Sequence, residues 1–305
     1  MTAPRLYLVS LSLCFACPVI SASNGLQRLE ACVEQKDQAC ISAFLKNASS
    51  DHSPEYLALA ARAYMLLGQN QEAMKSIAEA IELKPDNYDY LMEQGWLCQR
   101  SGDQVSAIES FLRASKINPQ SPAVFYELGI SFFFAKENER AIRHFSHALQ
   151  LDPKNDRAEF MIGVVEIWRG DLKEAKLHFE SALKLQPHNA HYLLHYGVLL
   201  AALNEDDLAF ANISEARMLD PSNPLTRFQL GKRYRTMGKL TEAREELEAA
   251  VRLRPNLSSA LYQLGQLYHQ LGEDAKSREA FEKFAKLSQQ EKTGKEDPID
   301  ANLEE

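Results

Sequence analysis

The stretch from Glu127 to Pro153, "ELGISFFFAKENERAIRHFSHALQLDP", returns in its essentials from Gln229 to Pro255, "QLGKRYRTMGKLTEAREELEAAVRLRP". Each stretch carries a glycine at its third residue, small alanines and one large apolar residue in its second half, and a proline at its end. A pattern that recurs at a fixed spacing indicates that the chain is built from repeats, and repeats decide the fold.

The prolines give the period. Six of the twelve prolines in the chain are spaced 34 residues apart. They are Pro85, Pro119, Pro153, Pro187, Pro221 and Pro255. Glycines follow the same period at Gly95, Gly129, Gly163, Gly197, Gly231 and Gly265. We therefore expect each repeat to be a helix, a turn and a second helix, with the proline ending the second helix.

The small residues have a steric role in this scheme. Glycine on the first helix and alanine on the second remove side-chain bulk where the two helices cross closely. A large apolar residue such as Phe145 then fills the space beside Gly129.

These residues resemble the tetratricopeptide repeat family, whose signature contains Leu-Gly-x-x-Tyr, a later alanine, an aromatic residue, another alanine and a proline. The resemblance implies an all-α fold, a right-handed α-solenoid of about seven 34-residue helix-turn-helix repeats. It covers residues 54–288, with repeats starting near residues 54, 88, 122, 156, 190, 224 and 258. A partial repeat in the same register, residues 24–53, is predicted to be an N-terminal helical hairpin. The last 17 residues, 289–305, are polar and acidic without periodicity, so we expect a disordered tail.

The first 23 residues have the pattern of a secretory signal peptide. Arg5 precedes an apolar run, and the small residues 21–23 follow it, so cleavage is expected after Ala22 or Ser23. A second interpretation makes Cys17 the lipid-anchored cysteine of a lipoprotein, although Cys14 stands where that pattern prefers leucine. In either case we expect an exported protein, periplasmic or secreted, whose mature chain has no transmembrane segment.

Export would allow disulfides, because oxidising compartments preserve them. Cys32 and Cys40 lie on either side of a polar turn, so the helical hairpin would bring their sulfur atoms together. Cys98 would remain a buried free thiol. A zinc site is not expected, since no second closely spaced Cys or His pair accompanies the first.

The charge balance limits the class of partner. The formal net charge is -8, which disfavours a nucleic-acid backbone as ligand. In the tetratricopeptide family, partners contact positions 2, 5, 9, 12 and 13 of each first helix. In the middle repeats these positions hold Met92, Trp96, Tyr126, Ile130, Phe133, Phe134, Phe160, Val164, Ile167, Trp168, Leu194 and Val198.

This aromatic stripe has two interpretations. It forms a groove for a protein or peptide partner, such as an amphipathic helix, or for a second copy of the chain, since aromatic residues are common in binding surfaces. Alternatively the rings pack against one another and fill the groove. Of the three consecutive phenylalanines, Phe132 belongs between the two helices of its own repeat, whereas Phe133 and Phe134 project toward the groove.

Two groups of residues could carry chemistry. Glu159 and Glu166 are a candidate carboxylate pair for a hydrolase, with salt bridges to a neighbouring repeat as the structural alternative. His188, His191 and His195 are a candidate metal cluster, with solvated histidines on the helix surface as the alternative. We favour a non-catalytic exported scaffold without a cofactor, in envelope or secretion-machinery assembly. An enzyme using either group is the second hypothesis.

Overall fold

The computed structural model describes residues 22–46 and 52–293, and within these ranges it contains sixteen α-helices and no strand. The predicted all-α solenoid is confirmed. The apolar run of the signal-peptide pattern lies outside the described residues, as do residues 294–305 of the predicted tail. The last helix continues to Thr293, so residues 289–293 are helical and the boundary predicted at residue 288 is too early.

The chain divides into two compact units, residues 1–119 and residues 120–305. Unit 1 contains α1 (Ala22–Glu34), α2 (Gln38–Lys46), α3 (Pro54–Leu66), α4 (Asn70–Leu83), α5 (Tyr88–Arg100) and α6 (Gln104–Ile117). Unit 2 contains α7 (Pro122–Phe134), α8 (Asn138–Leu151), α9 (Asp156–Arg169), α10 (Leu172–Leu185), α11 (Ala190–Ala202), α12 (Asp206–Leu219), α13 (Pro224–Thr236), α14 (Leu240–Leu253), α15 (Ser258–Gln270) and α16 (Asp274–Thr293).

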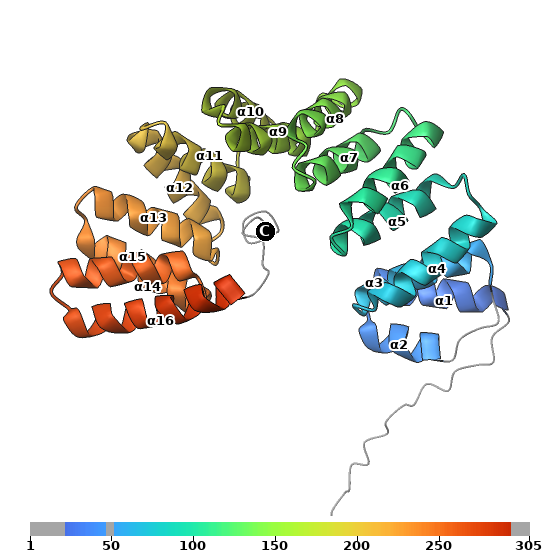
Figure 1. Ribbon diagram of the computed structural model, residues 1–305, viewed down its shortest axis with the longest axis horizontal. Coiled ribbons are helices and arrows are strands. Elements are labelled where there is room, and N and C mark those ends of the chain that lie inside the picture. The colour runs from blue at the N-terminus through green and yellow to red at the C-terminus, as the bar shows by residue number, and fades with distance from the viewer. Residues whose placement is uncertain (1–21, 47–51, 294–305) are drawn as a thin grey trace, which may run out of the picture. The chain divides into compact units, whose positions relative to one another are not determined.

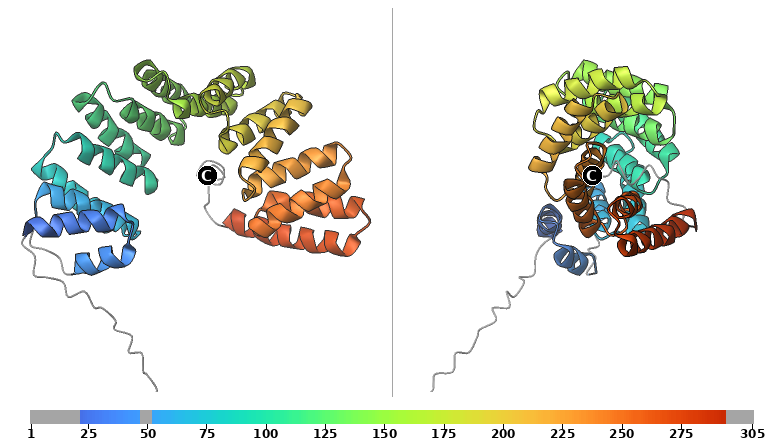
Figure 2. Two further views of the ribbon diagram at one scale, coloured as in Figure 1. Left: turned by 180° about the vertical axis from the view of Figure 1, so that it is seen from behind. Right: turned by 90° about the vertical axis from the view of Figure 1, so that its left-hand side faces the viewer.

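Each repeat is a pair of adjacent helices, and within unit 2 the pairs lie side by side in chain order (Figure 1). The views from behind and from the side show the same succession (Figure 2). Capping residues explain where the first helices begin. Asn155, Asn189 and Asn223 accept hydrogen bonds from the first turns of α9, α11 and α13, which satisfies amide groups that have no partner inside the helix.

The glycines that recur every 34 residues allow the two helices of a repeat to make close contact. A Cβ atom added to Gly129 would lie 2.5 Å from the Phe145 ring, and one added to Gly163 would lie 2.6 Å from the Phe179 ring. Both rings are fully buried. The first and second helices of a repeat can therefore approach this closely only because the glycine has no side chain.

The N-terminal hairpin packs its apolar side on α3. Leu29 and Ile41 are completely buried in a cluster with Tyr56 of α3. A disulfide joins Cys32 and Cys40, whose Cα atoms are 5.7 Å apart. Cys98 is a buried free thiol, and burial together with nearby Asp103 raises its pKa to about 11. None of the helices in the described ranges has both the length and the apolar composition needed to cross a membrane.

Candidate partner-binding surface

The candidate surface of unit 2 consists of positions 2, 5, 9, 12 and 13 of its five first helices, α7, α9, α11, α13 and α15. We call it the first-helix face. The predicted stripe divides between the units, because Met92 and Trp96 belong to unit 1 and the other members to unit 2. Each unit therefore presents its own part of the predicted site.

Half of the predicted site residues are buried. These are Met92, Tyr126, Phe133, Phe160, Val164 and Leu194, each with 8% or less of its surface exposed. Phe160 shows the reason, because its ring stacks 5.2 Å from Phe179 in its own repeat and 4.6 Å from Tyr192 in the next. The interpretation that the aromatic rings pack against one another therefore applies to these residues, which lie beneath the surface.

The remaining predicted residues are accessible. Trp168 is 57% exposed and Val198 37% exposed, while Ile130, Phe134 and Ile167 are half-buried. The indole of Trp168 meets the ring of Phe133 edge to face, with the ring centroids 6.3 Å apart. Phe133 in turn lies 5.6 Å from Phe134. Trp168 is thus an exposed aromatic side chain supported by a buried one.

The three consecutive phenylalanines have three different environments. Phe132 is fully buried and stacks on His144 of the second helix, with Arg140 above its ring at 3.9 Å. Phe133 is also buried, and only Phe134 reaches the surface in part. The expectation for Phe132 agrees with the structure, whereas Phe133 supports Trp168 and does not project freely.

Three cations of the first-helix face lack carboxylate partners among the described residues. The Arg157 guanidinium lies 4.4 Å from the centroid of the Tyr126 ring, and the Lys232 ammonium lies 5.4 Å from that of Phe228. Arg235 donates a hydrogen bond of 3.0 Å to the neutral amide oxygen of Gln266. Sequence reasoning did not single out this feature, although the absence of Asp and Glu from these positions would have indicated it.

In unit 1, the accessible aromatic residue is Trp96, which is 40% exposed. The buried carboxylate of Glu93 on the same helix accepts a hydrogen bond of 3.0 Å from Nε of Arg62. Its other oxygen, Oε1, is buried without a hydrogen-bond partner among the described residues. Burial raises the pKa of Glu93 from 4.5 to about 7, although Arg62 acts in the opposite direction.

Glu93→Gln should change how the stability of unit 1 depends on pH. Because the folded-state pKa is raised, Glu93 contributes stability that is present below pH 4.5 and lost as the pH rises toward 7. Urea unfolding at pH 5 and pH 8 should therefore show that the variant gains stability relative to the native chain at the higher pH. An equal difference at both pH values would contradict the assignment to Glu93.

The two glutamates of the hydrolase hypothesis have structural partners. Glu159 lies 2.7 Å from Nδ1 of His178, and buried Glu166 accepts hydrogen bonds of 2.9 and 3.0 Å from Nη1 of Arg169. The structural alternative of engaged glutamates therefore holds, but the partners belong to the same repeat and not to a neighbouring one, as had been expected. Glu166 and Arg169 are three residues apart on one helix, a spacing that brings side chains together.

The histidines do not form the cluster that the metal hypothesis requires. His191 and His195 are neighbours, with ring centroids 4.4 Å apart, and both pack against Phe160. Burial lowers the pKa of His195 to about 3, so it is a neutral packing residue and not a solvated one. His188 is exposed and lies 3.2 Å from Glu215. The described ranges contain no group of three His, Cys, Asp or Glu residues suited to a metal ion.

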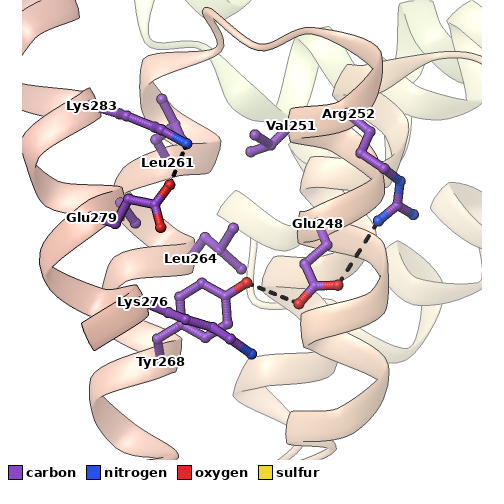
Figure 3. A pocket seen from close by; sticks show the side chains of 10 residues that line it. Glu248, Val251, Arg252, Leu261, Leu264, Tyr268, Lys276, Glu279 and Lys283 are labelled. Carbon is purple, nitrogen blue, oxygen red and sulfur yellow. Dashed lines mark hydrogen bonds and ion pairs between the residues drawn. The ribbon is translucent and has the colours of Figure 1, made fainter. Parts of the chain in front are cut away.

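A separate pocket of about 320 Å³ opens between α14, α15 and α16 (Figure 3). Val251, Leu261, Leu264 and Ala280 form its apolar part. The charged groups at its edge are engaged already, since Tyr268 donates to Glu248 at 2.9 Å and Lys283 pairs with Glu279 at 2.7 Å (Figure 3). A ligand in this pocket would therefore find mainly a small apolar surface to contact.

The pocket exists because a partly buried ion-pair group is absent from this repeat. One repeat earlier, the equivalent positions hold Arg217, Arg227 and Glu246. The Glu246 carboxylate accepts a hydrogen bond of 2.9 Å from Arg227 and lies 3.2 Å from Arg217. The positions 34 residues later hold Val251, Leu261 and Ala280, which are apolar and leave space.

Family models match most of the repeat region. A model described as "Tetratricopeptide repeat" matches residues 58–122 and 168–224, and a second model with the same description matches residues 258–291. A third, described as "TPR repeat", matches residues 231–272. Together these matches cover more than half of the chain. No sequence of a curated protein matches it.

Solved structures share the fold at low sequence identity. A tetratricopeptide repeat protein from Parabacteroides merdae is 17% identical, covers 80% of this chain and 97% of its own, and gives a TM-score of 0.63. PilF from Pseudomonas aeruginosa is 19% identical over 68% of this chain and 94% of its own, with a TM-score of 0.60. The Cut9–Hcn1 complex of the APC/C gives a TM-score of 0.63 at 14% identity, over 81% of this chain and 49% of that one. Because its glycines recur every 34 residues, its helices are paired and the family models match it, the chain belongs to the tetratricopeptide repeat family.

Proposed function

We propose that the protein is a non-catalytic scaffold that binds a protein or peptide partner on the first-helix face of unit 2. The observation that carries the proposal is Trp168, an indole held in place by buried Phe133 yet 57% exposed. Tryptophan is enriched among the residues that dominate binding energy, and ordering a side chain before binding lowers the entropy cost. Covering the rest of this indole would contribute on the order of 2 kcal/mol to binding.

The proposal includes export and a role in envelope or secretion-machinery assembly. Its support is the signal-like pattern of the first 23 residues and the Cys32–Cys40 disulfide, which is suited to an oxidising compartment. N-terminal sequencing of the protein from its own cells should find a mature chain beginning at Ser23 or Asn24. A chain that retains Arg5 in the cytoplasmic fraction would contradict export.

The scaffold is favoured over an enzyme because the candidate groups are already engaged. Glu166 is held by Arg169, Glu159 by His178, and the half-buried His195 packs against the rings of Phe160 and His191. Solenoid repeats present extended surfaces to partners, which fits a binding role.

Trp168→Gln should weaken peptide binding about 30-fold, because such an anchor contributes about 2 kcal/mol. The measurement selects random 12-residue peptides, displayed on phage, against the immobilised full-length protein and then titrates the enriched peptides. Leu177→Gln is the matched control, since Leu177 is 56% exposed but lies on a second helix, α10. If no peptide is enriched, or if both variants bind as the native protein does, the proposed site is wrong.

A further inference from the structure

The first-helix face of unit 2 has a charge opposite to that of the chain. The protein has 42 Asp and Glu residues against 34 Lys and Arg. At the average frequency of acidic residues, the five positions on each of five first helices would hold about three of them. They hold no Asp or Glu at all, and they do hold Arg157, Lys232 and Arg235. The face is therefore a basic surface on an acidic protein.

These cations differ from several others in unit 2, which form ion pairs. Away from the face, Lys176 contacts Glu205, Arg233 contacts Asp206, and Arg244 contacts Glu273. On the face, Arg157 and Lys232 lie over aromatic rings and Arg235 contacts an amide. Cations over rings keep donors available, because a ring engages the face of a guanidinium or the charge of an ammonium without accepting strong hydrogen bonds.

Among the described residues, the surroundings of Lys232 contain cations and no carboxylate that pairs with its ammonium group. Partial burial lowers the pKa of Lys232, and the neighbouring Arg233 and Arg235 lower it further. Two of the acids near the face, Asp156 and Asp274, have partners: Tyr192 donates to Asp156 at 2.7 Å, and His269 lies 3.5 Å from Asp274. A bound carboxylate would relieve the repulsion among the three cations of α13.

We propose that the partner is an acidic polypeptide segment with at least one aromatic or large aliphatic side chain, and that Arg157, Lys232 and Arg235 select it by pairing with its carboxylates. This inference rests on the proposed function and specifies the chemistry of its ligand. The apolar part of the segment would contact Trp168, Val198 and Tyr262, which are exposed apolar side chains of the same face. Complementary charge mainly supplies selectivity and speed of association, while the apolar contact supplies affinity.

The test compares the net charge of selected peptides. Random 12-residue peptides are selected on the native chain, on the variant Arg157→Gln, Lys232→Gln, Arg235→Gln, and on the control Lys173→Gln, Lys184→Gln, Arg278→Gln. The control residues are exposed and lie on the second helices α10 and α16, so both variants lose three positive charges from unit 2.

We expect peptides enriched on the native chain to be net acidic and to contain an aromatic or large aliphatic residue. They should bind the control variant as tightly as the native chain. They should bind the variant that lacks Arg157, Lys232 and Arg235 at least about tenfold more weakly. Their affinity for the native chain should fall as salt is added. Enrichment of neutral or basic peptides would overturn the inference while leaving the proposed function intact. Failure to enrich any peptide would overturn the proposed function itself. Heparin, an anionic polymer without apolar groups, should compete poorly with the selected peptides for the native chain. Binding of heparin as tight as that of the acidic peptides would also overturn the inference.

Discussion

Gly129→Ala should destabilise unit 2 by about 2 kcal/mol, although alanine is the better helix former. The new Cβ would lie 2.5 Å from Cε1 and 2.6 Å from Cδ1 of Phe145. Phe145 is completely buried, so its ring cannot turn away without displacing its neighbours. Thermal or urea unfolding of the two proteins measures the loss.

Two further variants separate this close contact from a general effect of the substitution. Gly25→Ala lies in α1, where the added Cβ would meet Phe44 at an ordinary 3.7 Å, so it should be neutral or stabilising by up to about 1 kcal/mol. In a Phe145→Leu background, Gly129→Ala should cost at least about 1 kcal/mol less than in the native chain. Equal costs in the two backgrounds would show that the contact with Phe145 is not the cause.

Glu246→Ala should cost about 2 kcal/mol, because it leaves the partly buried Arg227 and the more exposed Arg217 close together without their shared carboxylate. The side chain of Glu246 is 10% exposed, so water cannot replace it easily. The chain contains its own apolar alternative one repeat later, in Val251, Leu261 and Ala280. Chemical denaturation of the variant measures the loss.

The triple variant Arg217→Val, Arg227→Leu, Glu246→Ala copies that alternative. It should recover most of the stability that Glu246→Ala loses, since replacing all members of a buried or partly buried ion group by apolar residues is often neutral. If the triple variant is as unstable as the single one, the loss comes from packing around Glu246 and not from the unpaired cations.

The fold could be predicted from the sequence because it depends on steric contacts that recur with a fixed period. Gly129 and Phe145 are one example, and every repeat from residue 88 onward has its own glycine facing a large apolar side chain. The pairing of Cys32 with Cys40 could also be predicted, since it depends only on a short hairpin.

The accessible part of the site could not be predicted in the same way. Phe160 and Trp168 belong to the same predicted stripe, yet Phe160 is 4% exposed and Trp168 57% exposed. The difference depends on the next repeat, whose Tyr192 and His195 cover Phe160. Burial at these positions is set by particular neighbours, which do not follow the 34-residue period. For the same reason His195, predicted to be solvated if it bound no metal, is a half-buried packing residue.

Tryptophan fluorescence reports both the exposure of Trp168 in the free protein and its covering by a bound partner. The protein has two tryptophans, so Trp96→Phe leaves Trp168 as the single emitter. We expect red-shifted emission that acrylamide quenches efficiently in the free protein. Saturation with a selected acidic peptide should shift the emission to the blue and protect the indole from quenching. Unchanged emission and quenching at saturating peptide would contradict the claim that partners bind on the first-helix face.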